Sequence, residues 1–355
     1  MPRRSGATLV EVLVAIFVMG IGMLTLLVLF PIGVLTMAQA IQDDRTARAV
    51  ENAVAIANMF DYRQDPQLDP FFNNPDNAGA GWSDAQSLGP SYPIYLDPVG
   101  RLSFSQPHKD FVAGQGNVAQ GNVATTIIPT SNNYAGCTGI RRVDPSYITN
   151  LLTDGDPLND IRVRPNVSKY FISADDIEFD ENAVPRNVSA DPTNPQFKRN
   201  STYSWAYLLR RPMNDVTNVV EMNVIVYNKR PLTLDARAQP DETLYAAHFD
   251  PTNNVVTLSW AIGGARRTPN LRLGDWILDT TPVKYGTKWG PPHANFYRVV
   301  SITENAPYVS NGNTIGSVSI EVQTPIRDFP NGVVSEGLVT VLDGVAEVFQ
   351  VRVEN

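Results

Sequence analysis

The sequence predicts an α+β fold in which a long N-terminal helix packs on an antiparallel sheet and a β-rich C-terminal module, a small barrel or sandwich, follows. Two observations lead to this prediction. Residues 12–42 contain no charged side chain, which is typical of a long apolar helix. From Tyr203 onward, short runs of β-branched and aromatic residues are separated by Gly, Pro and Asn turns, as in strands.

Composition excludes several classes of protein. Among 355 residues there is one cysteine, Cys137, so no internal disulfide can form, and there are only three histidines. The formal net charge of −8 argues against a chain that coats nucleic acid, and no nucleic-acid partner is expected. No nucleophile elbow, P-loop or zinc-protease motif occurs, so we expect no enzymatic activity.

The uncharged stretch is long enough to cross a membrane. As a helix, residues 12–42 would extend ~46 Å, against about 30 Å for the hydrocarbon core of a bilayer. Arg3 and Arg4 precede the stretch, so the positive-inside rule leaves the N-terminus in the cytoplasm and the body of the protein outside it. The alternative is a secretory signal peptide cleaved after residues 38–40. Against that alternative, the apolar run is too long and Glu11 stands at its start.

The residues around Glu11 carry a resemblance. Residues 3–6 (Arg-Arg-Ser-Gly), followed by residues 7–15 (Ala-Thr-Leu-Val-Glu-Val-Leu-Val-Ala), resemble the class III signal of type IV pilins and type II secretion pseudopilins. Residues 13–16 and Ile21-Gly22 are most like those of PilV-type minor pilins. The resemblance implies that residues 1–6 are a leader, that prepilin peptidase cuts between Gly6 and Ala7, and that Ala7 is then N-methylated.

In this family Glu11 would be the glutamate five residues into the mature chain. A carboxylate within apolar surroundings needs a cation. The new α-amino group of a neighbouring subunit is such a cation, and their pairing would fix the axial register between subunits. The resemblance therefore makes Glu11 the candidate assembly residue.

The helix is expected to continue beyond the membrane, over residues 7–65 in all. Pro31 lies inside it and predicts a bend or a locally melted stretch, although a Pro kink is tolerated in any membrane helix. After residue 42 apolar residues recur at three- and four-residue steps, and Asp44 and Arg48 form an i, i+4 pair. This second half should pack against the globular head.

Residues 66–230 are expected to form a pilin-like head with long loops. Proline is frequent up to residue 200, where only short strands such as Tyr92–Leu96 and Tyr170–Ile172 are predicted. Residues 203–211 and 219–228 then predict a hairpin, which by resemblance belongs to the antiparallel pilin sheet.

Residues 231–355 are expected to form the C-terminal β-rich module. Its predicted strands are residues 243–249, 255–262, 273–279, 296–303, 317–324, 338–342 and 345–353. Asp343-Gly344 between the last two favours the type I′ turn of a hairpin.

Two acidic stretches are candidates for structural calcium, since hard cations prefer clustered oxygen ligands. The candidate ligands are Asp154, Asp156 and Asp160 in the first stretch and Asp175 and Asp176 in the second. Neither stretch completes an EF-hand, and a solvated strand with one buried face explains the second better than calcium does. We therefore expect no cofactor, with calcium as the alternative.

Together these observations predict a minor pilin or pseudopilin. It would be stored as a single-pass inner-membrane protein and assembled into a type IV pilus-like filament, sparsely or at its tip. Its partners would be prepilin peptidase, other pilin subunits and the inner-membrane assembly platform. Two alternatives stay open: a periplasmic pseudopilin of type II secretion, and a membrane-anchored binding or adhesion protein that does not polymerise.

Overall fold

The computed structural model describes most of the helix and strand framework of the chain. The described residues are 9–64, 94–103, 142–143, 165–187, 197–200, 202–210, 221–230, 242–263, 268–285, 288–292, 294–310, 312–326 and 335–351. The chain divides into two compact units, Met1–Arg48 and Ala49–Asn355, which are described separately below.

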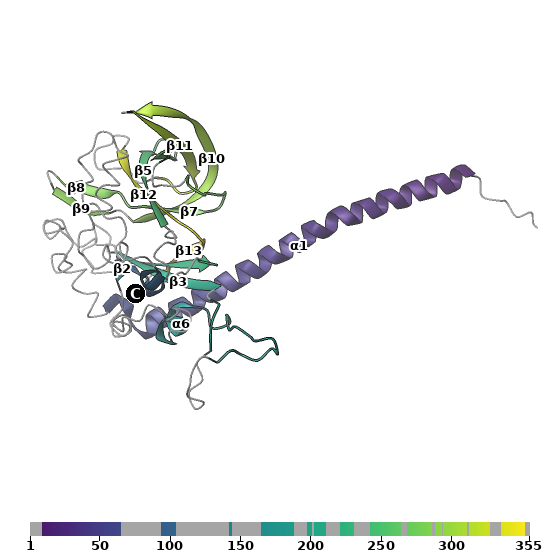
Figure 1. The fold of residues 1–355 in the computed structure, drawn as a ribbon, viewed down its shortest axis with the longest axis horizontal. Helices are drawn as coiled ribbons and strands as arrows, with labels where there is room; N and C mark the ends of the chain where they lie inside the picture. The colour runs from purple at the N-terminus through teal and green to yellow at the C-terminus, as the bar shows by residue number, and fades with distance from the viewer. Residues whose placement is uncertain are drawn as a thin grey trace, which may run out of the picture. The chain divides into compact units, whose positions relative to one another are not determined.

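Helix α1 (Leu9–Met59) accounts for the described part of the first unit and continues into the second (Figure 1). It ends earlier than the predicted residue 65. Asp61 takes a left-handed backbone conformation with φ of 45°, which interrupts the α-helical pattern. A short 3₁₀ helix, η1 (Tyr62–Gln64), follows.

A five-stranded sheet forms the centre of the second unit, with strand order β13-β4-β3-β1-β2. Its strands are β1 (Ile94–Leu96), β2 (Arg142–Val143), β3 (Tyr203–Arg210), β4 (Glu221–Asn228) and β13 (Val345–Val351). Strands β1 and β2 are parallel and the other pairs are antiparallel. The predicted hairpin over residues 203–228 is confirmed, with Tyr203 opposite Asn228 and Arg210 opposite Glu221.

The C-terminal module is a closed six-stranded barrel, the first of the two architectures predicted for it. In barrel order the strands are β10 (Asn295–Ser310), β11 (Asn313–Val322), β6 (Val255–Ala261), β5 (Glu242–Asp250), β12 (Ser335–Leu342) and β7 (Trp276–Asp279). A separate pair, β8 (Pro282–Tyr285) and β9 (Lys288–Pro292), was not predicted. Alternate residues such as Val256, Leu258 and Ile320 fill the barrel interior.

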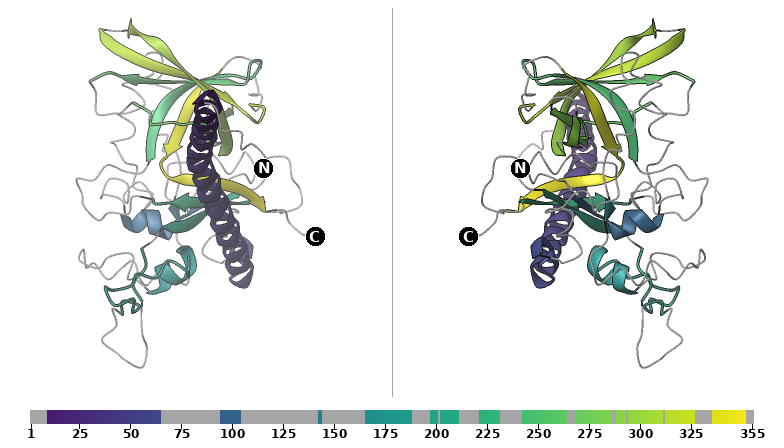
Figure 2. Two further views of the ribbon diagram at one scale, coloured as in Figure 1. Left: turned by 90° about the vertical axis from the view of Figure 1, so that its right-hand side faces the viewer. Right: turned by 90° about the vertical axis from the view of Figure 1, so that its left-hand side faces the viewer.

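The predicted hairpin of residues 338–342 and 345–353 is wrong. Strand β12 pairs with β5 and β7 in the barrel, whereas β13 pairs with β4 in the five-stranded sheet. The chain therefore passes from barrel to sheet at Gly344, whose φ is +80°. Figure 2 shows this last strand, in yellow, leaving the barrel and running along the sheet. A turn dipeptide specifies a change of direction but not the partner of the strand that follows.

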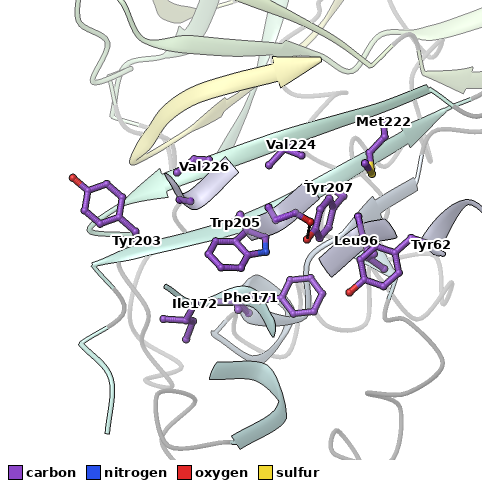
Figure 3. Packing of buried hydrophobic residues seen from close by; sticks show 14 of the residues in the cluster. Tyr62, Leu96, Phe171, Ile172, Tyr203, Trp205, Tyr207, Met222, Val224 and Val226 are labelled. Carbon is purple, nitrogen blue, oxygen red and sulfur yellow. Dashed lines mark hydrogen bonds between the residues drawn. The ribbon is translucent and has the colours of Figure 1, made fainter. Parts of the chain in front are cut away.

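One face of the sheet packs on helices. Ala49, Ala53 and Ala57 of α1 are buried in one cluster with Trp205 and Tyr207 of β3 (Figure 3). The Tyr207 hydroxyl donates a hydrogen bond of 2.8 Å to the Ala53 carbonyl oxygen. Small alanine side chains allow the helix backbone to approach the aromatic residues closely, so a hydroxyl on the sheet reaches the main chain of the helix.

Two short helices complete this side of the unit, α3 (Pro98–Ser103) and α6 (Pro165–Phe171). The prediction of a strand at Tyr170–Ile172 is wrong, because α6 continues to Phe171 and only Ile172 makes a β-bridge, with Ser204. Pro165 at the first position favours a helix here, and Phe171 enters the cluster in Figure 3.

The other face of the sheet packs on the barrel. Tyr95, Ile225 and Tyr227 of the sheet share a buried cluster with Leu278 and Leu342 of the barrel. Helix end, sheet and barrel thus form successive layers, and the apolar residues of β4 are buried on both faces.

Candidate assembly segment

Glu11 lies in the first turn of α1 and its side chain is exposed. A carboxylate at this position interacts favourably with the positive end of the helix dipole. Arg3, Arg4, Gly6 and Ala7 lie outside the described residues, so the structure adds nothing to the predicted leader and cleavage site.

Large apolar side chains cover α1 on all sides from Leu9 to Ile41. Exposed examples are Leu9 (76%), Phe17 (68%), Leu27 (75%), Phe30 (75%) and Met37 (66%). A helix that is hydrophobic all round belongs in a lipid bilayer or in a packed assembly. This surface, together with Glu11 near its N-terminal end, is defined here as the assembly segment, residues 9–42.

Charged residues begin directly after the assembly segment. Arg48 and Asp44 form the predicted i, i+4 ion pair at 3.0 Å, with both side chains more than half exposed. Among the described residues, no helix meets the length and hydropathy expected of a membrane span. The span predicted over residues 12–42 therefore stays a prediction.

Helix α1 continues through Pro31. Nearby, the Thr36 hydroxyl donates a hydrogen bond of 2.9 Å to the Gly33 carbonyl oxygen, within the turn that follows the proline. A bend at Pro31 stays a prediction.

The acidic residues proposed for calcium are only partly described. Asp154, Asp156 and Asp160 lie outside the described residues. In the second stretch, Asp176 accepts a hydrogen bond of 2.7 Å from the Tyr203 backbone N–H. The neighbouring Asp175 is exposed. In the described part of the chain no three metal-ligating side chains gather.

Glu178, in the same acidic stretch, is held by two cations. Its carboxylate lies 2.7 Å from Arg186 and 3.2 Å from Lys198. Hydrogen bonds from these two side chains lower the pKa of Glu178 below its usual range. Asp176 and Glu178 of this stretch are thus engaged in a hydrogen bond and in ion pairs with residues of the second unit.

A buried polar cluster in the second unit had no signal in the sequence. Arg230 and Asp97 form an ion pair with no exposed side-chain surface, and the Arg230 guanidinium carbon lies 4.1 Å from the centre of the Tyr227 ring. The Tyr227 and Tyr95 hydroxyls are hydrogen-bonded. Burial, followed by the proximity of Tyr227, raises the pKa of Tyr95 well above its usual value.

Comparison with known families bears on the N-terminal segment. Residues 1–27 match the prokaryotic N-terminal methylation motif. The match supports the class III signal and indicates a type IV pilin-like protein that prepilin peptidase processes, with membrane anchoring and assembly with other pilins implied. The comparisons with curated proteins and with solved structures gave no match.

Proposed function

We propose that this chain is a minor pilin or pseudopilin. Among these classes, we propose that it most resembles the PilV-type minor pilins. Prepilin peptidase cuts it after Gly6, and it joins a type IV pilus-like filament through its N-terminal helix. The observation that carries the proposal is the continuity of the methylation motif, residues 1–27, with the exposed apolar surface of α1. The proposed role is structural, without catalysis, metal or cofactor.

The assembly segment is stable only where it is kept out of water, in the bilayer or in the filament, and the exchange of lipid for neighbouring helices then depends on packing between helices. Each large apolar side chain removed from water stabilises the buried state by about 1.5–3 kcal/mol. Before assembly the bilayer covers this surface, and in the filament the helices of neighbouring subunits replace the lipid. We propose a single inner-membrane span over residues 12–42, with the N-terminus in the cytoplasm and the second unit outside, and delivery to the filament by the inner-membrane assembly platform.

Glu11 sets the register in this proposal. Cleavage creates an α-amino group at Ala7, whose methylation keeps the positive charge. Pairing with Glu11 of a neighbour neutralises both groups within an apolar core, where an uncompensated charge is costly. A subunit that slips along its neighbour loses this pairing, so one axial offset is favoured.

Processing is tested by the intact mass of the full chain, purified from cells with and without active prepilin peptidase. We expect loss of Met1–Gly6 and addition of one methyl group only where the peptidase is active. The control is Gly33→Ala, which changes a glycine within α1, outside the proposed leader, and should be processed like the unchanged protein. A chain that retains Met1–Gly6 beside the active enzyme contradicts the proposed cleavage.

Assembly is tested with Glu11→Ala in a cell that makes filaments, measuring the fraction of the protein in sheared filaments. The matched control is Glu51→Ala, which removes an exposed carboxylate from the same helix beyond the assembly segment. We expect Glu11→Ala to reduce incorporation at least tenfold and Glu51→Ala to leave it unchanged. Equal incorporation of both variants would contradict the register role.

The filament's composition separates the remaining alternatives. Because the second unit spans Ala49–Asn355, most of the chain, we expect few copies per filament or a tip location, measured as the ratio to the major subunit. Filaments confined to the periplasm would assign the chain to a type II secretion pseudopilus. A protein that keeps its leader and never enters filaments would be a membrane-anchored binding or adhesion protein.

A further inference from the structure

A cleft of about 600 Å³ lies in the second unit, between the barrel and the β13 edge of the five-stranded sheet. Asn223 of β4 and Val348 and Gln350 of β13 line it on the sheet side. Trp276 of β7 and Phe296 of β10 line it on the barrel side. The other described lining residues are Ala294, Asn295, Tyr297, Thr324, Pro325 and Ile326.

The strand register explains why two amides meet on the sheet side. Asn223 and Gln350 are direct cross-strand partners in the β4–β13 pair. Ile225 and Val348, two residues along each strand, belong to the buried cluster between sheet and barrel. Side chains two residues apart on a strand lie on the same face of the sheet. The amides of Asn223 and Gln350 therefore lie on the face that packs on the barrel, next to the apolar side chains of Ile225 and Val348.

The barrel side supplies aromatic surface. Trp276 and Phe296 meet edge to face with their ring centres 6.5 Å apart. Both are only partly buried, whereas Tyr297 points into the barrel core and is 3% exposed. The indole nitrogen of Trp276 is buried and has no hydrogen-bond partner among the described residues.

Charge narrows the class of ligand. None of the described residues that line the cleft carries a charged side chain. Arg298, opposite Trp276 in the β7–β10 pair, is engaged by Glu347 at 3.7 Å and lies 5.8 Å from the Trp276 ring centre. An anionic ligand would therefore find no positively charged side chain to pair with among the described residues that line the cleft.

We propose that this cleft binds a neutral oligosaccharide. Its volume lies within the roughly 300–1,000 Å³ of small-molecule sites, which commonly form where domains meet. The C–H face of a sugar ring would lie against the partly exposed aromatic rings. Each amide offers both donors and acceptors, which suits adjacent hydroxyl groups. The proposal concerns the second unit alone and does not rest on how the helix assembles.

The test is titration calorimetry of the full chain in a detergent without a sugar headgroup. The probes are maltotriose, cellotriose and chitotriose, with the anionic trigalacturonate as comparison. We expect saturable binding of at least one neutral trisaccharide. Losing one hydrogen bond costs roughly 0.5–1.5 kcal/mol, so Gln350→Ala and Asn223→Ala should each weaken that binding about 2- to 12-fold.

The matched control is Asn313→Ala, which removes an exposed amide from the barrel strand β11, away from the lining residues. It should bind like the unchanged protein. Because Gln350 is exposed, its substitution tests the cleft without disturbing the core. Absence of saturable binding by all three neutral probes overturns the proposal. So does binding that the cleft substitutions leave unchanged, or equal binding of trigalacturonate.

Discussion

The Arg230 guanidinium donates two hydrogen bonds to the Asp97 carboxylate, from Nη1 to Oδ1 and from Nη2 to Oδ2, each of 2.8 Å. Asp97 directly follows β1, and Arg230 lies two residues after the end of β4. Two residues before Arg230, the Asn228 backbone N–H donates a hydrogen bond of 2.7 Å to the Gly344 carbonyl oxygen. Arg230 thus lies close to Gly344, where the chain passes from barrel to sheet, and we infer that the ion pair stabilises this crossing.

Breaking this ion pair should destabilise the second unit strongly. Asp97→Ala leaves a buried guanidinium without its counter-charge, which costs about 3–5 kcal/mol. Replacing both partners by apolar residues, Asp97→Leu with Arg230→Met, should recover most of the loss. Chemical denaturation of the full chain measures both effects. Asp44→Ala, which breaks the exposed pair with Arg48, is the control and should change stability by no more than ~0.5 kcal/mol. Similar losses for the buried and exposed pairs would contradict this account.

Gly100 is required for the same ion pair. Its backbone N–H donates a hydrogen bond of 2.9 Å to Asp97 Oδ1, and a Cβ atom there would collide with Asp97 Oδ2 and Arg230 Nη2. We expect Gly100→Ala to lower the free energy of unfolding by about 1–3 kcal/mol. Gly20→Ala is the control, because among the described residues no atom other than those of its chain neighbours and its own helix backbone lies within 4 Å of the position of a Gly20 Cβ. An unchanged denaturation midpoint for Gly100→Ala would contradict this prediction, because it would mean that Asp97 and Arg230 can move aside without loss of stability.

The hydrogen bond from Tyr207 to Ala53 joins the sheet to the last turns of α1. Tyr207→Phe keeps the ring in the core but removes the hydroxyl, so we expect a loss of about 1 kcal/mol. Tyr308→Phe provides the comparison, since Tyr308 is 50% exposed. Hydrogen exchange in residues 50–59 should rise in the first variant only. If exchange there is the same in both variants, the bond does not stabilise the helix end.

Acid should loosen the segment that Glu178 holds. Arg186 and Lys198 lower the pKa of Glu178 in the folded protein below its ordinary value of 4.5. The carboxylate therefore stabilises the fold above that value, and the contribution is lost as the pH falls through the folded-state pKa. Hydrogen exchange of the Glu178 N–H, which donates to the Lys198 carbonyl oxygen at 2.8 Å, reports the change.

The control amide for this experiment is Ile262 N–H, which bonds to the Thr314 carbonyl oxygen in the barrel at 2.8 Å. Glu178→Gln should make exchange of the Glu178 amide insensitive to acid. Protection of the Glu178 amide that responds to acid equally in Glu178→Gln and in the unchanged protein would show that the ion pairs do not hold this segment.

Elements defined by nearby residues were predicted well. The β3–β4 hairpin and most barrel strands follow from alternation over a few residues, which the pleat imposes. The end of α1 was missed because the left-handed conformation of Asp61 has no distinct signal. Helix α6 was missed because a three-residue apolar run fits either a strand or a helix end.

The sequence by itself determined the N-terminal chemistry, because a processing signal is read as a linear motif. Residues 1–27 carry that motif, and the uncharged stretch after Glu11 continues it. Only the tertiary structure decided that β13 joins β4, that Asp97 meets Arg230, and that Asn223 and Gln350 share a cleft with Trp276. These contacts join residues more than fifty positions apart, and their pairing depends on packing and hydrogen-bond geometry that no local pattern records.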